Sequence, residues 1–268
     1  MGIISLLTDF GTRDEYAGVI KGVIYGINPD VTVVDLSHEV PPQDISFAAH
    51  LLLSAYAFFP KGSIHVAVVD PGVGGKRNIL AARISGHIFI APDNGLLGPV
   101  LARGDIEELV HVEAPGLYLQ PVSHTFHGRD IFAPLAAHLS LGHDLKSLGS
   151  PLEQSLTVPL HLETPRCNEQ GNLCGCVVRS DHFGNLITNI SLAQLSAAGF
   201  TKDPATLVIR VGATSIHGIS PCYADGHPGE LLAVIGSTGF LEIAACMGTA
   251  AGTLGTKAGA TVTISKNT

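Results

Sequence analysis

The sequence predicts two domains: an α/β N-terminal domain with a largely parallel sheet flanked by helices, and a smaller, mainly β, barrel-like C-terminal domain. Over the first half of the chain, buried-strand patterns alternate with helical patterns, which is typical of α/β folds. From about Pro159 onward, short strand patterns are separated by turns rich in glycine, proline and asparagine. We expect the domains at residues 1–160 and 168–268, joined by a linker at 161–167.

Hydrophobic periodicity gives the N-terminal elements in order. The apolar run from Ile3 to Leu7 predicts a buried first strand. The following helix, which Asp14 can cap, has an apolar residue every three or four positions and stops at Asn28-Pro29. The same criteria predict strands at 31–36, 64–69, 79–84 and 87–91, and helices at 44–59 and 130–141.

The C-terminal elements are nearly all strands. Their expected positions are 173–178, 186–190, 207–211, 231–235, 241–244 and 260–264. Only residues 192–198 have a helical pattern. A succession of short strands with turn residues between them is the pattern of a sandwich or barrel.

Composition excludes several classes of protein. Hydrophobic residues make up 46% of the 268-residue chain and charged residues 14%, as in a globular protein with a sizeable core. A net charge of −8 argues against a general nucleic-acid binder. No apolar segment reaches the roughly 20 residues of a membrane-spanning helix, and the start of the chain lacks the pattern of a signal peptide. We therefore expect a cytoplasmic protein without membrane contact.

The five cysteines all lie in the C-terminal third of the chain. We interpret them as small, buried apolar residues in a reducing compartment. Cys174-x-Cys176 together with Cys167 does not have the spacing of a zinc knuckle, so no metal site is expected.

The stretch VVDPGVGGKRNILAA places a carboxylate, Asp70, at the end of a buried strand and Arg77 seven residues later. A glycine-rich loop after a strand resembles a phosphate-binding loop at first sight. A Walker loop, however, ends in Gly-Lys-Ser/Thr, whereas here Arg77 follows Lys76. The glycines also do not fit G-x-G-x-x-G, so a dinucleotide site is excluded as well.

Polar side chains follow several predicted strands of the N-terminal domain. Asp9 and Asp70 end two of them, and Asp93-Asn94 follows the run HIFIAP. Each position alone is explained by the frequency of Asp and Asn in turns. Because ligands of α/β sheets bind beyond the carboxyl ends of strands, the three positions together predict a binding site.

The segment TFHGRDIFAPLAAHL adds His127 at a junction between a loop and a helix. Asp130 is interpreted as the cap of that helix and Arg129 as a surface charge, whereas the His127 ring can point into a cleft. The chain has no H-E-x-x-H or G-x-S-x-G motif, which gives little support to a zinc or serine hydrolase.

The C-terminal domain offers two further polar turns. SDHFGNLITNI places Asp181 and Asn185 around a Phe-Gly turn, and GSTGFLEIA places Ser237 in a turn between glycines. A hairpin explains these residues without a ligand. Residue chemistry alone therefore predicts a polar cleft but names no reaction.

Taken as a set, LLTDFG, VVDPGVG with Arg77, APDNG, FHGRDIFAP, DHFGN-LITNI and GS-x-G-x-LEIA resemble the S-adenosyl-L-methionine (SAM) hydroxide adenosyltransferases. These adenosine-forming SAM hydrolases are relatives of the fluorinases and chlorinases. The similarity covers essentially the whole chain, in order. It implies that water or hydroxide displaces methionine at the ribose C5′ of SAM, giving adenosine and L-methionine.

The resemblance also implies roles for residues. An Asp-Arg-His set that handles the water matches Asp70, Arg77 and His127. The residues expected to bind substrate are Asp9, on the ribose hydroxyls, Asp93 and Asn94 in the shared APDNG segment, and Asp181, Asn185 and Ser237 near the methionine or adenine portions. SAM is the substrate, and no metal or other cofactor is implied. The family forms trimers in which SAM lies between the N-terminal domain of one subunit and the C-terminal domain of its neighbour.

Two alternatives stay open. A SAM-dependent halogenase would use chloride or fluoride in place of water, but its extra loop after APDNG has no obvious counterpart in the segment LLGPVLARGDIEELV. A non-catalytic SAM- or adenosine-binding protein would show the same binding residues without turnover.

Overall fold

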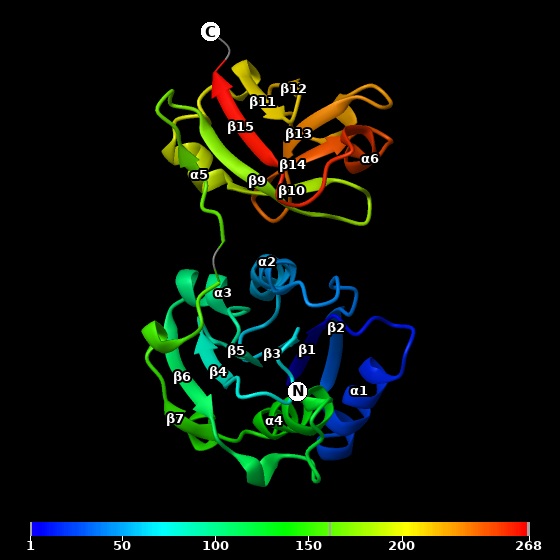
Figure 1. The fold of residues 1–268 in the computed structure, drawn as a ribbon, viewed down its shortest axis with the longest axis vertical. Helices are drawn as coiled ribbons and strands as arrows, with labels where there is room; N and C mark the ends of the chain where they lie inside the picture. The colour runs from blue at the N-terminus through cyan, green and yellow to red at the C-terminus, as the bar shows by residue number, and fades with distance from the viewer. Residues whose placement is uncertain (1, 161, 267–268) are drawn as a thin grey trace. The chain divides into compact units, whose positions relative to one another are not determined.

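The computed structural model describes residues 2–160 and 162–266. The chain divides into two compact units, Met1–His161 and Leu162–Thr268, and each has its own sheet and hydrophobic core (Figure 1). Among the described residues, no helix is long and apolar enough to cross a bilayer.

The first unit contains a seven-stranded mixed sheet in the order β2-β1-β3-β5-β4-β6-β7. Strands β2, β1, β3 and β5 pair in parallel, whereas β5, β4, β6 and β7 pair antiparallel. The strands are β1 (Ile3–Thr8), β2 (Thr32–Ser37), β3 (Ile64–Val68), β4 (Ile79–Ile84), β5 (His87–Pro92), β6 (Ile106–Val112) and β7 (Gly149–Pro151). The expected α/β class is confirmed, with parallel pairing confined to one half of the sheet.

Helices cover both faces of this sheet (Figure 1). Ile4 and Leu6 of β1 pack with α1 and α4 on one face, while Leu7 packs with α2 and α3 on the other, because successive side chains of a strand point to opposite faces. The helices are α1 (Tyr16–Ile27), α2 (Ile45–Ala55), α3 (Gly98–Arg103) and α4 (Ala133–Ser140), with short 3-10 turns at Tyr56–Phe58, Pro115–Leu117, Leu145–Leu148 and Gln154–Leu156.

Three helix boundaries differ from those expected. The residue before α1 is Glu15, without a side-chain capping bond, and Asp14 is exposed, so the expected Asp14 cap is wrong. Helix α2 is capped by Asp44 as its sequence indicates but becomes a 3-10 turn after Ala55. The helix expected from Asp130 begins instead with a π-helical turn, Gly128–Phe132, which continues into α4.

The second unit is an antiparallel sheet of eight strands, with β12-β11-β15-β9-β10-β14-β13 in order and β8 paired to β9. A bridge between Ser220 and Val234 links the region after β12 to β13, so the sheet is nearly closed and barrel-like, as expected. The strands are β8 (Arg166–Cys167), β9 (Leu173–Ser180), β10 (Leu186–Ser191), β11 (Leu207–Val211), β12 (Thr214–His217), β13 (Leu231–Ile235), β14 (Phe240–Ala245) and β15 (Thr261–Lys266); the helices are α5 (Leu192–Ala197) and α6 (Ala250–Leu254), with 3-10 turns at Pro204–Thr206 and Tyr223–Asp225.

The expected linker and the cysteines both differ in part from what the sequence predicts. Arg166 and Cys167, placed in the expected linker, form β8 and pair with β9 of the second sheet.

All five cysteines are free, but only Cys246 is buried, and Cys167 and Cys222 are exposed. The interpretation of the cysteines as buried apolar residues is therefore wrong for those two.

Candidate active site

Asp70, Arg77 and His127 form one hydrogen-bonded group in the first unit. Arg77 Nε donates to Asp70 Oδ2 at 2.8 Å and to Oδ1 at 3.1 Å, and one terminal nitrogen of Arg77 lies 2.8 Å from His127 Nδ1. The side chains of Asp70 and Arg77 are only 5% and 12% exposed, so solvent screens this ion pair weakly. The structure thus brings together three residues that lie far apart in the sequence.

The hydrogen bonds of this group define the tautomer and the protonation state of His127. A guanidinium only donates hydrogen bonds, so His127 Nδ1 accepts from Arg77 and the proton of the neutral ring is on Nε2. Burial, and then the positive charge of Arg77, lower the pKa of His127 below its ordinary value, against the opposing effect of Asp70. His127 is therefore neutral at physiological pH and presents Nε2–H as a donor.

The glycine-rich loop after β3 holds Arg77 in place by packing closely on the segment before His127. Gly74 has φ +77°, and a Cβ added to it would lie 2.1 Å from the backbone oxygen of His124. Only glycine combines this backbone conformation with such a close approach. The glycine-rich stretch after Asp70 thus lets the loop pack against the segment that carries His127.

The segment that carries His127 is held by Asp130. This carboxylate is fully buried and accepts from the backbone N–H of Ser123 at 2.8 Å and from Arg129 Nε at 2.6 Å. Arg129 also lies over the ring of Phe126, 5.6 Å from its centre. The interpretation of Asp130 as a helix cap is thus wrong. Arg129, whose side chain is 36% exposed, is a surface charge as expected, and its ion pair with Asp130 holds the loop that precedes the π-helical turn.

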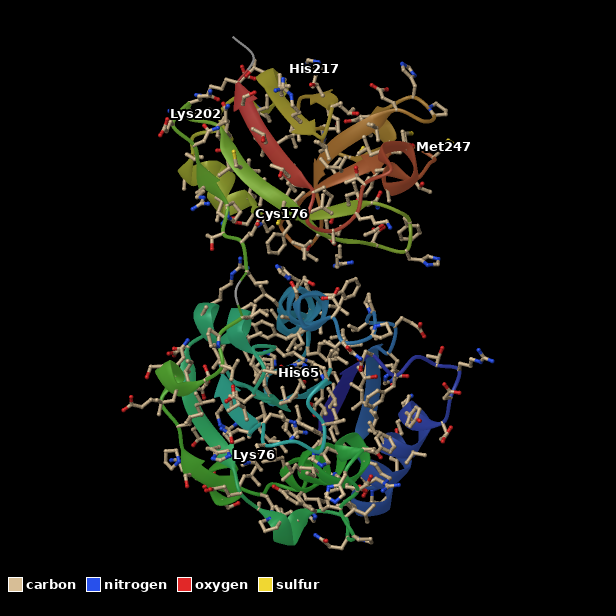
Figure 2. All side chains as sticks on the ribbon, viewed as in Figure 1. His65, Lys76, Cys176, Lys202, His217 and Met247 are labelled. Atoms are coloured by element: carbon tan, nitrogen blue, oxygen red, sulfur yellow. The ribbon has the colours of Figure 1, made fainter. Side chains whose placement is uncertain are left out.

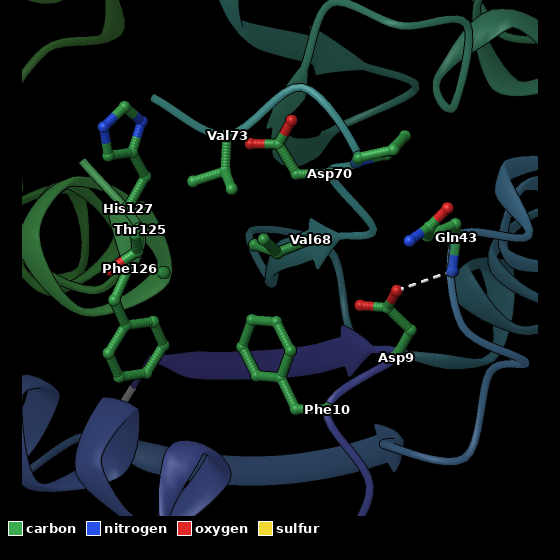
Figure 3. A pocket seen from close by; sticks show the side chains of 11 residues that line it. Asp9, Phe10, Gln43, Val68, Asp70, Val73, Thr125, Phe126 and His127 are labelled. Carbon is green, nitrogen blue, oxygen red and sulfur yellow. Dashed lines mark hydrogen bonds between the residues drawn. The ribbon is translucent and has the colours of Figure 1, made fainter. Parts of the chain in front are cut away.

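A cavity of about 250 Å³ opens beside Asp70 and His127 (Figure 3). Asp9, at the end of β1, lies across the cavity from His127, and its carboxylate accepts from the backbone N–H of Gln43 at 2.8 Å. Arg77 contacts Asp70 and His127 without itself lining the cavity. The full lining is Asp9, Phe10, Gln43, Val68, Asp70, Pro71, Val73, Thr125, Phe126, His127 and Gly128.

Asp93 and Asn94 occupy a turn that does not line this cavity. Asp93 is buried and accepts from the backbone N–H of Val158 at 2.8 Å. Asn94 donates to the backbone oxygen of Val69 at 2.8 Å and accepts from the N–H of Leu96. These contacts are typical of turn residues. Asn94 also holds the backbone of Val69, which directly precedes Asp70.

The second unit has its own cavity, of about 850 Å³, which Asp181, Asn185 and Ser237 all line. Asp181 is held by Asn185, whose backbone N–H and side-chain amide donate to the two carboxylate oxygens at 2.8 and 2.9 Å. The other lining residues are Arg179, Phe183, Ile187, Tyr223, Thr238, Glu242, Ala245, Met247, Gly248 and Thr249. The candidate residues of the sequence therefore fall into two groups, one in each unit.

The two units match two family models. Residues 4–149 match the SAM hydroxide adenosyltransferase N-terminal domain, and residues 175–263 match the corresponding C-terminal domain. The chain belongs to the SAM hydroxide adenosyltransferase family.

Relatives of this chain carry names that agree with the match to the family. A protein of Salinispora tropica named (R)-S-adenosyl-L-methionine hydrolase is 37% identical over 260 residues, covering 96% of this chain and 95% of that protein. A hydrolase of the same name from Thermus thermophilus is 36% identical over 266 residues, covering 96% of each. A fluorinase of an Actinoplanes species is more distant, at 29% identity over 290 residues, covering 98% of this chain and 97% of that protein.

The fold of this chain is also found in solved structures. An uncharacterized conserved protein from Thermotoga maritima superposes with a TM-score of 0.91 at 36% identity, covering 98% of this chain and all of that one. A conserved hypothetical protein from Thermus thermophilus gives a TM-score of 0.78 at 33% identity over 99% of this chain and 100% of that chain.

Three polar residues of the second cavity were not predicted from the sequence. Arg179 and Glu242 face the same side of the sheet, because both pair in register with Ile187 of the strand between them. Glu242 is buried and accepts from the Tyr223 hydroxyl at 2.7 Å. Burial, and then the Glu242 carboxylate, raise the pKa of Tyr223. The signal available in the sequence was the charge of Arg179 and Glu242 within otherwise apolar strands.

Proposed function

We propose that this protein hydrolyses SAM to adenosine and L-methionine by attack of water or hydroxide on the ribose C5′. The observation that carries the proposal is the hydrogen-bonded Asp70–Arg77–His127 group beside a cavity at the edge of the sheet. Membership of the SAM hydroxide adenosyltransferase family and the names of the hydrolase relatives support the same reaction.

The reaction needs a positioned nucleophile more than an acid. As the C5′–O bond forms, the C5′–S bond breaks and its electron pair goes to sulfur, so methionine leaves as a neutral thioether. One proton of the attacking water is released. Holding the water in line with the C–S bond can supply ~7 kcal/mol or more of the rate enhancement.

The hydrogen bonds within the group leave His127 as a donor and Asp70 as an acceptor for the attacking water. The Nδ1 lone pair of His127 is occupied by Arg77, so this ring can only donate to the water, through Nε2–H. Asp70 keeps free lone pairs on its carboxylate oxygens and is the acceptor for the proton of the water. The positive charge of Arg77, which is bonded to Asp70 and His127, stabilises negative charge on the nucleophile.

The substrate is proposed to be shared between two surfaces. Asp9 would bind the ribose hydroxyls, and Asp181, Asn185 and Ser237 would contact the methionine or adenine portions. The cavity of the first unit, at about 250 Å³, is below the ~300–1,000 Å³ of most small-molecule sites, which supports completion of the site by another surface. We propose a homotrimer in which that surface belongs to the C-terminal domain of a neighbouring subunit.

Three further expectations are part of this proposal. The domains are proposed at residues 1–160 and 168–268, with a linker between them. Asp93 and Asn94 are proposed to act on the substrate site through the turn that they form rather than by contact. A cytoplasmic location remains a prediction of the sequence.

The deciding experiment is incubation of the purified protein with SAM, with and without chloride or fluoride, followed by chromatography of the nucleosides. The expected product is adenosine, with oxygen-18 from labelled water in its 5′-hydroxyl. Absence of adenosine, with SAM left intact, would overturn the hydrolase and favour a binding protein.

A halogenase is the second candidate, because fluorinases are among the relatives at 28–29% identity. The same experiment tests it. A 5′-halo-5′-deoxyadenosine formed only when halide is present would move the assignment to a halogenase.

A further inference from the structure

A continuous chain of hydrogen bonds runs from the surface of the first unit to the end of β1. Lys21 Nζ donates to Asp35 Oδ2 at 2.6 Å, and Asp35 Oδ1 lies 3.1 Å from His38 Nε2. On the other side of the ring, His38 Nδ1 lies 2.7 Å from Thr8 Oγ1. His38 is 3% exposed and Thr8 is fully buried, so this end of the chain is shielded from water.

The direction of each hydrogen bond in this chain follows from its partners. The Asp35 carboxylate only accepts, so His38 donates to it through Nε2–H; in the neutral form of the ring, Nδ1 then accepts from the Thr8 hydroxyl. Burial alone would raise the pKa of Asp35, but the hydrogen bonds from Lys21 and His38 outweigh it and lower the pKa. The carboxylate therefore stays charged and orients the His38 ring through Nε2–H.

The buried end of the chain is joined to the wall of the proposed active site. Thr8 Oγ1 also accepts the backbone N–H of Phe10 at 3.3 Å, and the N–H of Gly11 donates to the backbone oxygen of His38 at 2.8 Å. Asp9, which lies between Thr8 and Phe10, lines the cavity together with Phe10 (Figure 3). The backbone on both sides of Asp9 is thus tied to Thr8 and His38.

The order Thr8–His38–Asp35 resembles the order of a nucleophile, a base and an orienting acid. Thr8, however, is fully buried and does not line the cavity, and its oxygen is engaged with His38 and Phe10. A nucleophile has to reach the substrate. Thr8 therefore helps to position a loop and is not a nucleophile.

We propose that Lys21, Asp35, His38 and Thr8 form a positioning network that sets the affinity for SAM by fixing Asp9 and Phe10. The inference rests on the proposed function, in which Asp9 binds the ribose hydroxyls. Because Asp9 is used for substrate binding and not for activating water, loosening the network weakens binding and leaves the chemical step nearly unchanged.

The test is a set of substitutions in β1 and β2, assayed for adenosine formation at varied SAM concentrations. Thr8→Val removes the hydroxyl at nearly constant volume, and we expect it to raise KM about tenfold with kcat within about twofold. Thr8→Ser keeps the hydroxyl and is expected to restore KM to within about twofold of the wild type. Asp35→Ala, at a side chain 42% exposed, is expected to raise KM by about threefold in a folded protein.

Ser5→Ala is the matched control. Ser5 lies on the same strand, is 1% exposed, and makes a similar hydrogen bond of 2.7 Å to a buried histidine, His65. His65 does not line the cavity. Loss of this bond is expected to lower stability while KM stays within about twofold of the wild type.

The outcomes separate this inference from the proposed function. Wild-type protein that forms no adenosine would overturn the proposed function. If the wild type is active, an unchanged KM in both Thr8→Val and Asp35→Ala would overturn the network. A collapse of kcat in Thr8→Val at unchanged KM would also overturn it, since that result would place Thr8 in the chemical step.

Discussion

At the scale of single residues, the proposed chemistry depends on how three side chains divide donors and acceptors. Arg77 donates to both Asp70 and His127, which fixes the neutral ring with its proton on Nε2. In the proposed reaction, the ring donates to the water while the Asp70 carboxylate accepts from it. The Arg77 guanidinium therefore determines that His127 acts as a donor and Asp70 as an acceptor in the proposed reaction.

Arg77→Ala and His127→Ala are expected to lower kcat by about 10²–10³-fold while SAM binding is largely retained. The physical reason is that both residues act on the nucleophile, whereas Asp9 and the second cavity are proposed to hold the substrate. Measurement of kcat, and of Kd by calorimetry, checks this.

Lys76→Ala is the control for these two variants, because Lys76 is the exposed neighbour of Arg77 (Figure 2). Its kcat is expected to match the wild type. Weak binding with normal turnover of the bound fraction in the Arg77 and His127 variants would contradict their catalytic roles.

At the scale of elements, the site depends on two loops that are held against each other. The glycine-rich loop carries Arg77, and the segment closed by Asp130 carries His127. The π-helical turn Gly128–Phe132 begins directly after His127, and such turns are frequent at functional sites. The site is thus assembled by contact between loops on a rigid sheet.

Gly74→Ala is expected to destabilise the protein by about 2–4 kcal/mol and to abolish most activity. The added Cβ would lie 2.1 Å from the His124 oxygen, so one loop has to move and the Arg77–His127 contact is lost. Urea unfolding and the adenosine assay measure the two effects.

Gly62→Ala serves as the matched variant, since Gly62 has φ +83° but no atom within 4 Å of its added Cβ. It is expected to lose only the ~1 kcal/mol of left-handed strain and to keep its activity. Equal activity in the two glycine variants would show that close loop packing is not required.

At the scale of the whole molecule, each of the two units has a hydrophobic core of its own. Within the first unit, His65 lies in the sheet, fully buried, 3.3 Å from the ring of His87 and 2.7 Å from the Ser5 hydroxyl (Figure 2). Burial, and then the neighbouring His87, lower the pKa of His65 to about 3. Both rings are thus neutral in the folded protein.

Stability of the first unit is therefore expected to fall as the pH drops below 6.5. In the unfolded chain His65 binds a proton near pH 6.5, whereas in the folded unit it binds one only near pH 3, so acid favours unfolding. From pH 7.5 to 5 this histidine alone predicts a loss of about 2 kcal/mol. Urea unfolding at the two pH values measures it.

His65→Gln is expected to reduce this pH dependence, because the substituted side chain does not titrate. The variant loses stability at both pH values, so the readout is the difference between them and not the stability itself. A difference as large as that of the wild type would contradict the assignment to His65.

Local periodicity and turn residues were enough to predict many of the strands and helices. The boundaries of β4, β11 and β13 agree with those expected, and the order of motifs identified the family that the whole-chain match then confirmed. Helix α3 and strand β6 were missed, because their short apolar runs carry no clear period.

Which side chains meet depends on contacts between segments that are distant in the sequence. Arg77 bonds to His127, fifty residues away, and His38 bonds to Thr8, thirty residues away, because sheet order and loop packing bring those segments together. The same contacts assigned Asp93 and Asn94 to a turn and placed Arg179 and Glu242 on one face of the second sheet. Local sequence specifies strands and turns, whereas hydrogen-bond partners depend on register and packing between distant segments.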